Sequence, residues 1–331
     1  MKFFTEVEIP GFPAKIDYSS KIIMMGSCFA EEIGAKLQKL KFNIDINPFG
    51  ILYNPVSIAN SLKILIKKRM FKPGDLYFKD GLWFSFSHHG RFSSEDRDKA
   101  LEQINSRIEA GAENIRNADY LFLTFGTAWV YELNSTGQVV SNCHKVPAGE
   151  FRRYRLPEPE ISEVYRDVLD ELWEINPNLK VVFTVSPIRH WKDGAVENQV
   201  SKATLLLAIN NIIGNYGNNQ CNYFPSYEIV MDELRDYRYY AADMLHLSDV
   251  AINLIWKKFE QALIHEESQN ISEEILKIQK AVEHRPVNMK TPEFKKFITN
   301  GLLKVNNLLE KHPYLNLKLE KDYFEEQIRN L

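Results

Sequence analysis

The sequence is poor in cysteine, has no long apolar run and carries no excess of charge of one sign. Three of its 331 residues are cysteine, too few for the disulfide framework of a small secreted domain, and no C-x-x-C pair indicates a zinc site. We expect Cys28, Cys143 and Cys221 to be reduced thiols. The longest uncharged apolar segment, residues 121–131, falls short of the roughly 18 residues that a membrane-spanning helix needs.

The balanced charge of the sequence argues against further classes of protein. The 41 basic and 44 acidic residues give a net charge of −3, without the long basic stripe expected of a nucleic-acid binder. The apolar fraction of 44% and the charged fraction of 26% are those of a folded globular protein. The N-terminus acquires two glutamates before any apolar run, which is unlike a signal peptide. We therefore expect a cytoplasmic protein that binds neither nucleic acid nor membrane.

Short apolar segments alternate with segments of helical period along most of the chain. We expect buried strands at 21–25, 120–125, 181–185 and 222–230, the last with Pro225 in its middle, and helices at 30–40, 55–69, 95–116, 162–175 and 198–216. Strands that alternate with helices imply crossover connections and a mostly parallel sheet covered on both faces. The pattern predicts an α/β fold whose active site lies beyond the carboxyl ends of the strands.

Two insertions and a C-terminal extension depart from this alternation. Residues 75–87 and 129–146 carry turn-forming residues between aromatic-rich or apolar flanks, so each predicts a β-hairpin. After His265 the sequence is charged and of helical period, with Ser272 and Thr291 as predicted helix starts. We expect a domain over residues 1–265 and a helical extension over residues 266–331.

The junction between the first strand and the first helix carries the most informative motif. Ser27, in the pentapeptide GSCFA at 26–30, is expected at the top of the sheet beside a helix N-terminus that can stabilise a developing oxyanion. Serine also caps helices very often, and the residues alone leave both roles open. Phe29 replaces the last glycine of a G-x-S-x-G elbow, and the further glycines of a dinucleotide or phosphate loop are missing.

The neighbouring Cys28 is an alternative nucleophile, provided that a histidine lowers its pKa. A small buried residue on the first helical turn is the more common role of a free cysteine.

A serine nucleophile needs a base, and the base needs a carboxylate that orients it. Among the eight histidines only His246 has an acidic residue three positions earlier, Asp243. This spacing on a turn lets the carboxylate accept the Nδ1 proton and leaves Nε2 free to face a hydroxyl. Ser248 follows as the predicted cap of an amphipathic helix.

Taken together, these motifs resemble the signature of the GSCFA family, a branch of the SGNH (GDSL-like) hydrolase superfamily. The resemblance begins with the pentapeptide and continues in five further blocks in the same order. The blocks are at 26–30, 47–55, 125–129, 142–147, 186–191 and 243–246. They cover residues 21 to about 262, and residues 266–331 lie outside them.

The resemblance implies a flavodoxin-like three-layer α/β/α fold and ester chemistry without a metal or a cofactor. Ser27 would be the nucleophile, His246 the general base and Asp243 the residue that orients it. The backbone N–H groups of Ser27 and Gly50 would form two parts of the oxyanion hole. Glycine suits a backbone that approaches the reacting carbonyl closely, although Gly50 also fits an ordinary turn.

The chain departs from the superfamily where an asparagine usually completes the oxyanion hole, because Ala128 stands there. Loss of one such donor costs roughly 10²–10³ in rate. Thr127 is the nearest candidate replacement in sequence, and Asn54, Asn142 and His144 are others.

A further set of polar residues is predicted to contact the substrate. Arg189 and His190 follow the third predicted strand, on the side of the sheet where ligands bind, and their chemistry suits an anionic or hydroxyl-rich ligand. The predicted substrate contacts are Asn54, Asn142, His144, Arg189 and His190. Purely structural roles remain open for these residues: an arginine often pairs with a neighbouring acid, and a loop histidine is often satisfied locally.

We therefore predict an SGNH-like serine esterase or acyl-transfer enzyme that acts on a small O-acyl ester, with a carbohydrate as one candidate carrier of that ester. Two alternatives remain. One is a ligand-binding protein that keeps the SGNH fold with weak or no activity, as Ala128 suggests. The other is a thiol hydrolase that uses Cys28. The sequence does not determine the acyl group, the acceptor or the oligomeric state.

Overall fold

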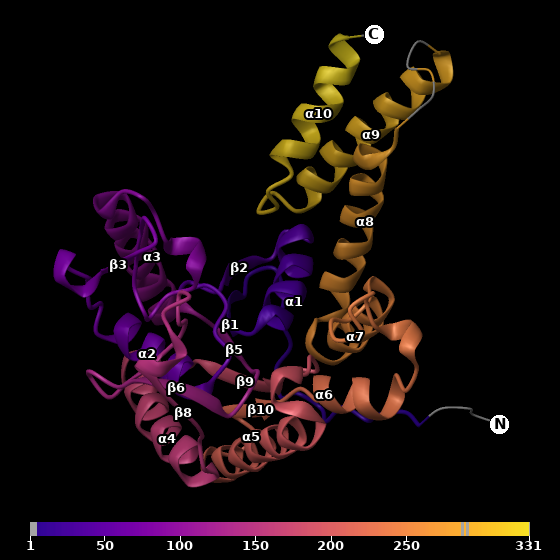
Figure 1. Cartoon of the computed structure of the whole chain (residues 1–331). Coiled ribbons are helices and arrows are strands. Elements are labelled where there is room, and N and C mark those ends of the chain that lie inside the picture. Colours follow the sequence, from indigo (N-terminus) through magenta and orange to yellow (C-terminus); the bar gives the residue numbers. More distant parts are fainter. Residues whose placement is uncertain (1–4, 286–287, 289–290, 331) are drawn as a thin grey trace.

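A five-stranded parallel sheet forms the centre of the protein in a computed structural model that describes residues 5–285, 288 and 291–330 (Figure 1). The strands, in spatial order, are β10 (Cys221–Tyr223), β9 (Lys180–Val185), β5 (Tyr120–Phe125), β1 (Lys21–Gly26) and β2 (Asn43–Ile46). Every neighbouring pair is parallel, so the carboxyl ends of all five strands lie at one edge. Three of the strands lie where the sequence predicts them.

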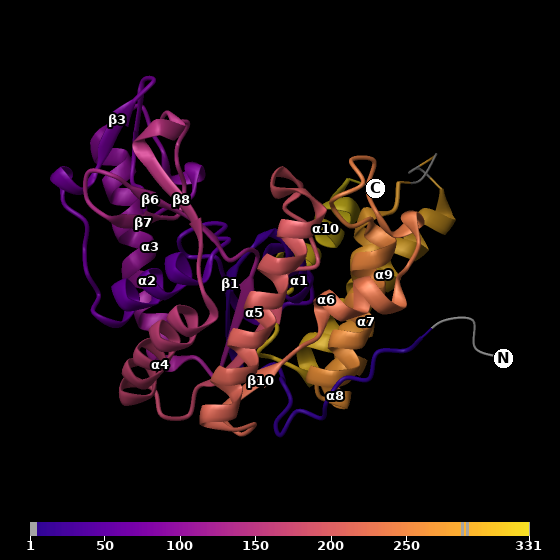
Figure 2. The same cartoon turned by 60° about the horizontal axis from the view of Figure 1, so that its bottom comes forward.

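Helices cover both faces of this sheet, as Figure 2 shows from another side. Along β1, Ile22 and Met24 pack on one face with α1 (Cys28–Lys39) and α7 (Asp249–Leu263). Ile23 and Met25 pack on the other face, because successive side chains of a strand alternate. That second face is covered by α2 (Pro55–Ile66), α3 (Arg97–Asn117), α4 (Glu158–Ile175) and α5 (Gly194–Tyr216). The predicted three-layer α/β/α arrangement is confirmed.

Both predicted hairpins are present beside the main sheet. The first is formed by β3 (Tyr77–Lys79) and β4 (Leu82–Phe84), and the second by β6 (Trp129–Leu133) and β7 (Gln138–Val140). A further strand that the sequence did not reveal, β8 (Phe151–Arg155), pairs with β6. A small apolar cluster joins the two insertions.

The predicted strand over 222–230 is wrong beyond its start. β10 ends at Tyr223, and the chain then forms the short helix α6 (Ser226–Glu228) and a π-helical turn over Ile229–Glu233. Pro225 offers no backbone N–H to a sheet, and the Ser226 hydroxyl donates to the carbonyl of Val185 at 2.7 Å. These two residues end the strand.

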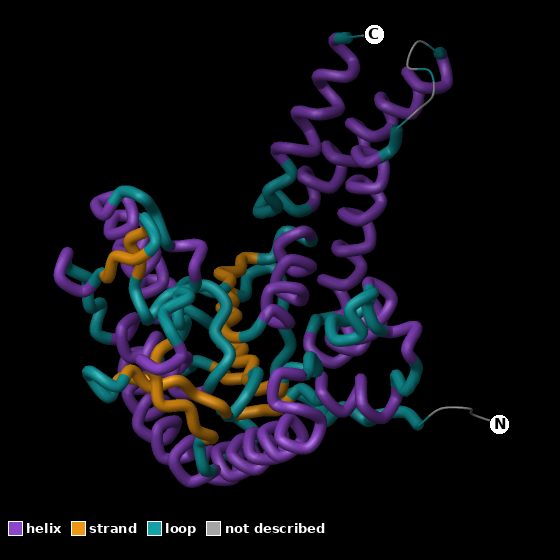
Figure 3. The backbone as a smooth tube through the Cα atoms, viewed as in Figure 1, coloured by secondary structure: helices purple, strands orange, loops and turns teal. Residues whose placement is uncertain are grey.

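Three helices make up the C-terminal part, and they extend away from the sheet in Figure 1 and in the tube of Figure 3. They are α8 (Glu266–Glu283), α9 (Pro292–Lys311) and α10 (Lys318–Arg329), and they share an apolar cluster of their own. Thr291 caps α9 as predicted, since its side chain accepts from the Phe294 N–H. None of the described helices has the length and apolar character of a membrane span.

The predicted helix start at Ser272 is wrong. Ser272 is buried in the middle of α8, and its hydroxyl is 3.0 Å from the Tyr18 hydroxyl. The helix begins earlier, at Glu266, where two successive glutamates suit the positive end of the helix dipole.

Candidate active site

Backbone geometry at the end of β1 determines where Ser27 lies. Gly26 has a φ of 136°, and a Cβ built there would be 2.2 Å from the carbonyl oxygen of Thr124 on the neighbouring strand. Only glycine fits this turn without strain. The Gly26 N–H donates to Oδ1 of Asn47 at 2.8 Å, which joins the next loop to the strand end. Ser27 is thereby positioned at the carboxyl edge of the sheet.

The Ser27 hydroxyl is buried and has no hydrogen-bond partner among the described residues. Ser27 is only 1% exposed and occupies the N-cap position of α1, yet its side chain does not cap the helix. A capping serine would accept from an amide two or three residues later. Burying a hydroxyl without a partner costs about 1–3 kcal/mol, and such a group in a native fold calls for an explanation. The capping role therefore finds no support in the side-chain geometry.

Asp243 and His246 form a pair on the loop before α7. The Asp243 carboxylate is 2.5 Å from Nδ1 of His246 and also accepts the N–H groups of Leu245 and His246. Hydrogen bonds from the His246 ring and from these amides lower the pKa of Asp243 to about 2. An ionised acceptor at Nδ1 places the ring proton there and leaves Nε2 as the basic nitrogen. Both side chains are about half exposed.

The serine and the histidine line one cavity of about 190 Å³, which we call the inner cavity. Its lining consists of Ser27, Cys28, Tyr53, Ser186, Ile188, Arg189, His190, Leu245 and His246. Four segments of chain thus meet beyond the ends of β1 and β9, on the side of the sheet where the strand order predicts a site. The Ser27 hydroxyl makes no hydrogen bond to His246, and such bonds are often long in a site without substrate.

The residues predicted to complete the oxyanion hole lie elsewhere. The Gly50 N–H donates to the carbonyl of Asn47 at 2.8 Å, and Gly50 does not line the inner cavity. The Ser27 N–H faces the Thr124 carbonyl at 3.3 Å, a long hydrogen bond. The Thr127 hydroxyl is 3.1 Å from that of Ser201 on α5. The oxyanion roles predicted for Gly50 and Thr127 are therefore without geometric support here.

Three of the predicted substrate contacts do not line the inner cavity, and each makes hydrogen bonds within the protein. Asn54 caps α2, since its Oδ1 accepts the Ser57 N–H at 2.7 Å. Asn142 accepts the backbone N–H of His144 at 2.9 Å. The His144 ring contacts two backbone carbonyls and stacks on Phe84 at 4.2 Å between centroids. His144 therefore has hydrogen-bond partners in the adjoining loop after β4, the alternative that the sequence left open.

Arg189 and His190 do line the inner cavity, as predicted from their place after β9. Burial, with a smaller contribution from the charge of Lys202, lowers the pKa of His190 to about 4. His190 is therefore neutral near pH 7, and its ring packs edge-on against Tyr53. It offers a neutral imidazole to a ligand rather than a charge.

Sequence reasoning missed Tyr53 and Ser186 as cavity residues and missed Lys202 behind them. The carbonyl of Tyr53 accepts the N–H of Gly126 at 2.8 Å, which places this loop over the end of β5. Ser186 directly follows β9, so it lies at the carboxyl edge of the sheet, where a site is expected. Lys202 is completely buried and donates to the carbonyls of Gly126 and Ser186 at 2.7 and 2.6 Å. In the sequence, the one indication of this role is that Lys202 stands beside apolar residues in the predicted helix over 198–216.

Cys28 lines the inner cavity beside Ser27, but its surroundings do not favour a thiolate. Burial is the largest cause that raises the pKa of this thiol, and the nearby Glu32 and Glu31 also raise it. Backbone N–H groups at the start of α1 act in the opposite direction, but the pKa remains above its ordinary value, whereas a reactive cysteine has a lowered one. Among the described residues, no group of three or more His, Cys, Asp or Glu side chains is arranged to hold a metal ion.

Comparisons with known proteins give a family for this chain. No curated protein matches it. One similar solved structure is an acetyl xylan esterase from the rumen bacterium Butyrivibrio proteoclasticus, at 14% identity and a TM-score of 0.32. That match covers 63% of this chain and 55% of the esterase, so it spans about half of that protein's length. A second family model, the C-terminal domain of GSCFA domain proteins, matches residues 275–330. The model of the GSCFA family matches residues 21–259, and the chain therefore belongs to the GSCFA family.

Proposed function

We propose that this protein is a serine esterase or acyl-transfer enzyme acting on a small O-acyl ester. The observation that carries the proposal is the buried Ser27 hydroxyl without a partner, which lines one cavity with a histidine whose Nδ1 is bonded to a carboxylate. This is the combination of nucleophile, base and orienting acid that acyl transfer requires.

The reaction follows from these positions. The Ser27 hydroxyl attacks the ester carbonyl while Nε2 of His246 takes its proton, and Asp243 stabilises the resulting imidazolium. Collapse of the tetrahedral intermediate breaks the ester bond, and His246 returns the proton to the departing alcohol. Water or an acceptor hydroxyl then attacks the acyl-serine, with His246 again acting as base. The chemistry needs no metal ion or organic cofactor.

The inner cavity also bears on the acyl group. Its volume of about 190 Å³ is below the 300–1,000 Å³ of typical ligand pockets. A short acyl group such as acetyl fits this volume, with the N-terminus of α1 facing the carbonyl oxygen. The positive end of that helix favours the developing oxyanion.

Labelling by a fluorophosphonate and hydrolysis of p-nitrophenyl acetate test the proposal. Ser27→Ala abolishes labelling and lowers kcat by at least about 10³-fold, and His246→Ala lowers kcat to a similar extent. Cys28→Ser is the matched control, because it alters the adjacent cavity residue and leaves the proposed nucleophile in place. Loss of activity in Cys28→Ser with retention in Ser27→Ala would assign the reaction to the thiol.

A specific observation favours a second candidate, a ligand-binding protein with weak or no turnover. Neither Gly50 nor Thr127 presents a donor to the inner cavity, and Ala128 is fully buried with its N–H bonded to Ser201. A folded sample that shows neither labelling nor hydrolysis would support this candidate.

A further inference from the structure

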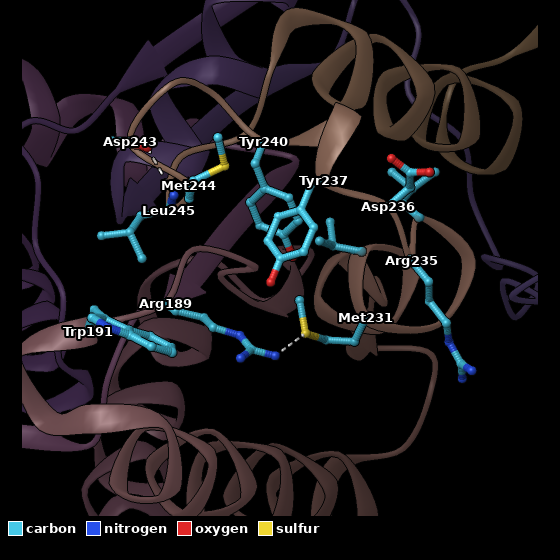
Figure 4. A pocket seen from close by; sticks show the side chains of 12 residues that line it. Arg189, Trp191, Met231, Arg235, Asp236, Tyr237, Tyr240, Asp243, Met244 and Leu245 are labelled. Carbon is cyan, nitrogen blue, oxygen red and sulfur yellow. Dashed lines mark hydrogen bonds between the residues drawn. The ribbon is translucent and has the colours of Figure 1, made fainter.

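A larger hollow adjoins the inner cavity and shares Arg189 and Leu245 with it. We call this hollow of about 480 Å³ the outer pocket. Figure 4 shows the Arg189 side chain crossing it toward Met231, with the rings of Tyr237 and Tyr240 above. Because the two spaces share these lining residues, they lie next to each other.

Arg189 is the cation of the outer pocket that has no acidic partner. Its Nε is buried without a hydrogen-bond partner among the described residues, and its Nη2 contacts the Met231 sulfur at 3.1 Å. A thioether is a weak acceptor, whereas a guanidinium has five N–H donors arranged for a carboxylate or a phosphate. Among the described residues no carboxylate oxygen lies within 4 Å of Arg189, so its charge is uncompensated.

The other charged side chains that line the outer pocket have partners. Asp243 is bonded to His246, Arg235 pairs with Asp232, and Asp236 pairs with Arg238. These pairs leave neither acid available to Arg189. Burial chiefly, and the charge of Arg189 to a smaller extent, lowers the pKa of Lys202, so a second basic group lies near Arg189. The local potential therefore favours an anion.

The rest of the wall is apolar and accessible. Trp191, Tyr237 and Met244 all line the outer pocket and are exposed, although each is large and hydrophobic. Exposed aromatic surface beside an uncompensated arginine suits a molecule with a flat or apolar body and an anionic group.

On the basis of the proposed esterase function, we propose that the alcohol part of the substrate carries a carboxylate or a phosphate, which Arg189 binds in the outer pocket. The acyl group then occupies the smaller inner cavity, and the anionic alcohol leaves through the larger space. This assignment makes Arg189 a specificity residue for the leaving group.

Binding to the Ser27→Ala protein tests this inference without requiring turnover. The probes are 4-acetoxybenzoate, 4-acetoxyphenyl phosphate and the uncharged methyl 4-acetoxybenzoate, measured by titration calorimetry. We expect at least one of the two anions to bind at least about tenfold more tightly than the neutral ester, and the stronger of them identifies the group. Addition of Arg189→Gln should remove this preference.

Arg152→Gln in the same Ser27→Ala background is the matched control, because Arg152 pairs with Glu132 and neither residue lines the outer pocket. It should keep the preference for the anion. Equal binding of all three probes, or a preference that survives Arg189→Gln, overturns the inference. If Arg189 binds the anionic probes but the protein with Ser27 intact does not hydrolyse them, the anion site stands and the esterase function is refuted. If that protein hydrolyses esters without a charge preference, the esterase function stands and the anion site is refuted.

Discussion

The two halves of the proposed active site are built in different ways. Ser27 is buried at a strand end that depends on a tight contact between Gly26 and the backbone of β5. Asp243 and His246 are about half exposed on a loop, and their hydrogen bonds to each other span only three residues. The nucleophile is therefore positioned by the core of the fold, and the base by local hydrogen bonds.

The difference shows that stability and activity are coupled at Ser27 and separable at Asp243 and His246. A change at the end of β1 disturbs the sheet, so it lowers both the stability of the fold and the activity. A change in the loop removes an exposed interaction that contributes little to the fold. Three substitutions test the contrast, in order of decreasing effect.

Gly26→Ala has the largest expected effect. Its Cβ meets the Thr124 backbone at 2.2 Å, and the positive φ adds strain, so we expect the free energy of unfolding to fall by about 3 kcal/mol or more, with loss of esterase activity. Urea unfolding measures the first and ester hydrolysis the second. Gly81→Ala is the matched control, since Gly81 has a φ of 80° but open space around it. Equal destabilisation by both substitutions would contradict the contact argument.

Asp243→Asn should separate activity from stability. The amide no longer stabilises an imidazolium at His246, so kcat should fall by about 10²–10⁴-fold. The free energy of unfolding should change little, because the pair is exposed to solvent. Asp80→Asn, at the tip of the first hairpin, is the control for loss of one surface carboxylate. A stability loss as large as that of Gly26→Ala would place the loop in the core of the fold.

Lys202→Met should change how the free energy of unfolding depends on pH. Burial lowers the pKa of Lys202 to about 7, below the ordinary value of 10.5 that applies in the unfolded chain. Between these values the unfolded state binds more protons, so this lysine adds stability as the pH rises from about 7 toward 10. Urea unfolding from pH 6 to 10 should show that the substitution removes this rise. An identical pH slope in both proteins would rule out the lowered pKa.

The sequence predicts the elements that are long or wholly apolar, and it misses those that depend on their neighbours. The pattern does not predict β2, because it is a short edge strand that contains Asp45. That carboxylate pairs with Arg107 and accepts a hydrogen bond from Asn114, both on α3. β8 escapes because three of its five residues are arginine. Pro225 lies inside the predicted strand over 222–230, and the observed strand ends before it because proline offers no N–H to the sheet.

The candidate site shows the same division. Ser27 and His246 are brought to one cavity because strand ends and loops follow from the order of elements. Asn54 and Asn142 bond to the backbone of near neighbours, as short polar side chains in loops often do, and the His144 ring contacts the carbonyls of Ser85 and His88; none of the three lines the inner cavity. Tyr53 and Lys202 required coordinates, since only packing distinguishes them from ordinary core residues.

Helix α1 carries Ser27 at its N-terminus, and its other end is attached to the C-terminal helices. Gln279 of α8 donates to the carbonyl of Lys39, and the Lys39 ammonium pairs with Glu283 at 2.8 Å. A helix of 12 residues is about 18 Å long, so α1 spans the distance between the proposed nucleophile and a part of the chain that contributes no residue to the inner cavity. The C-terminal helices thus hold the far end of the helix whose N-terminus carries Ser27.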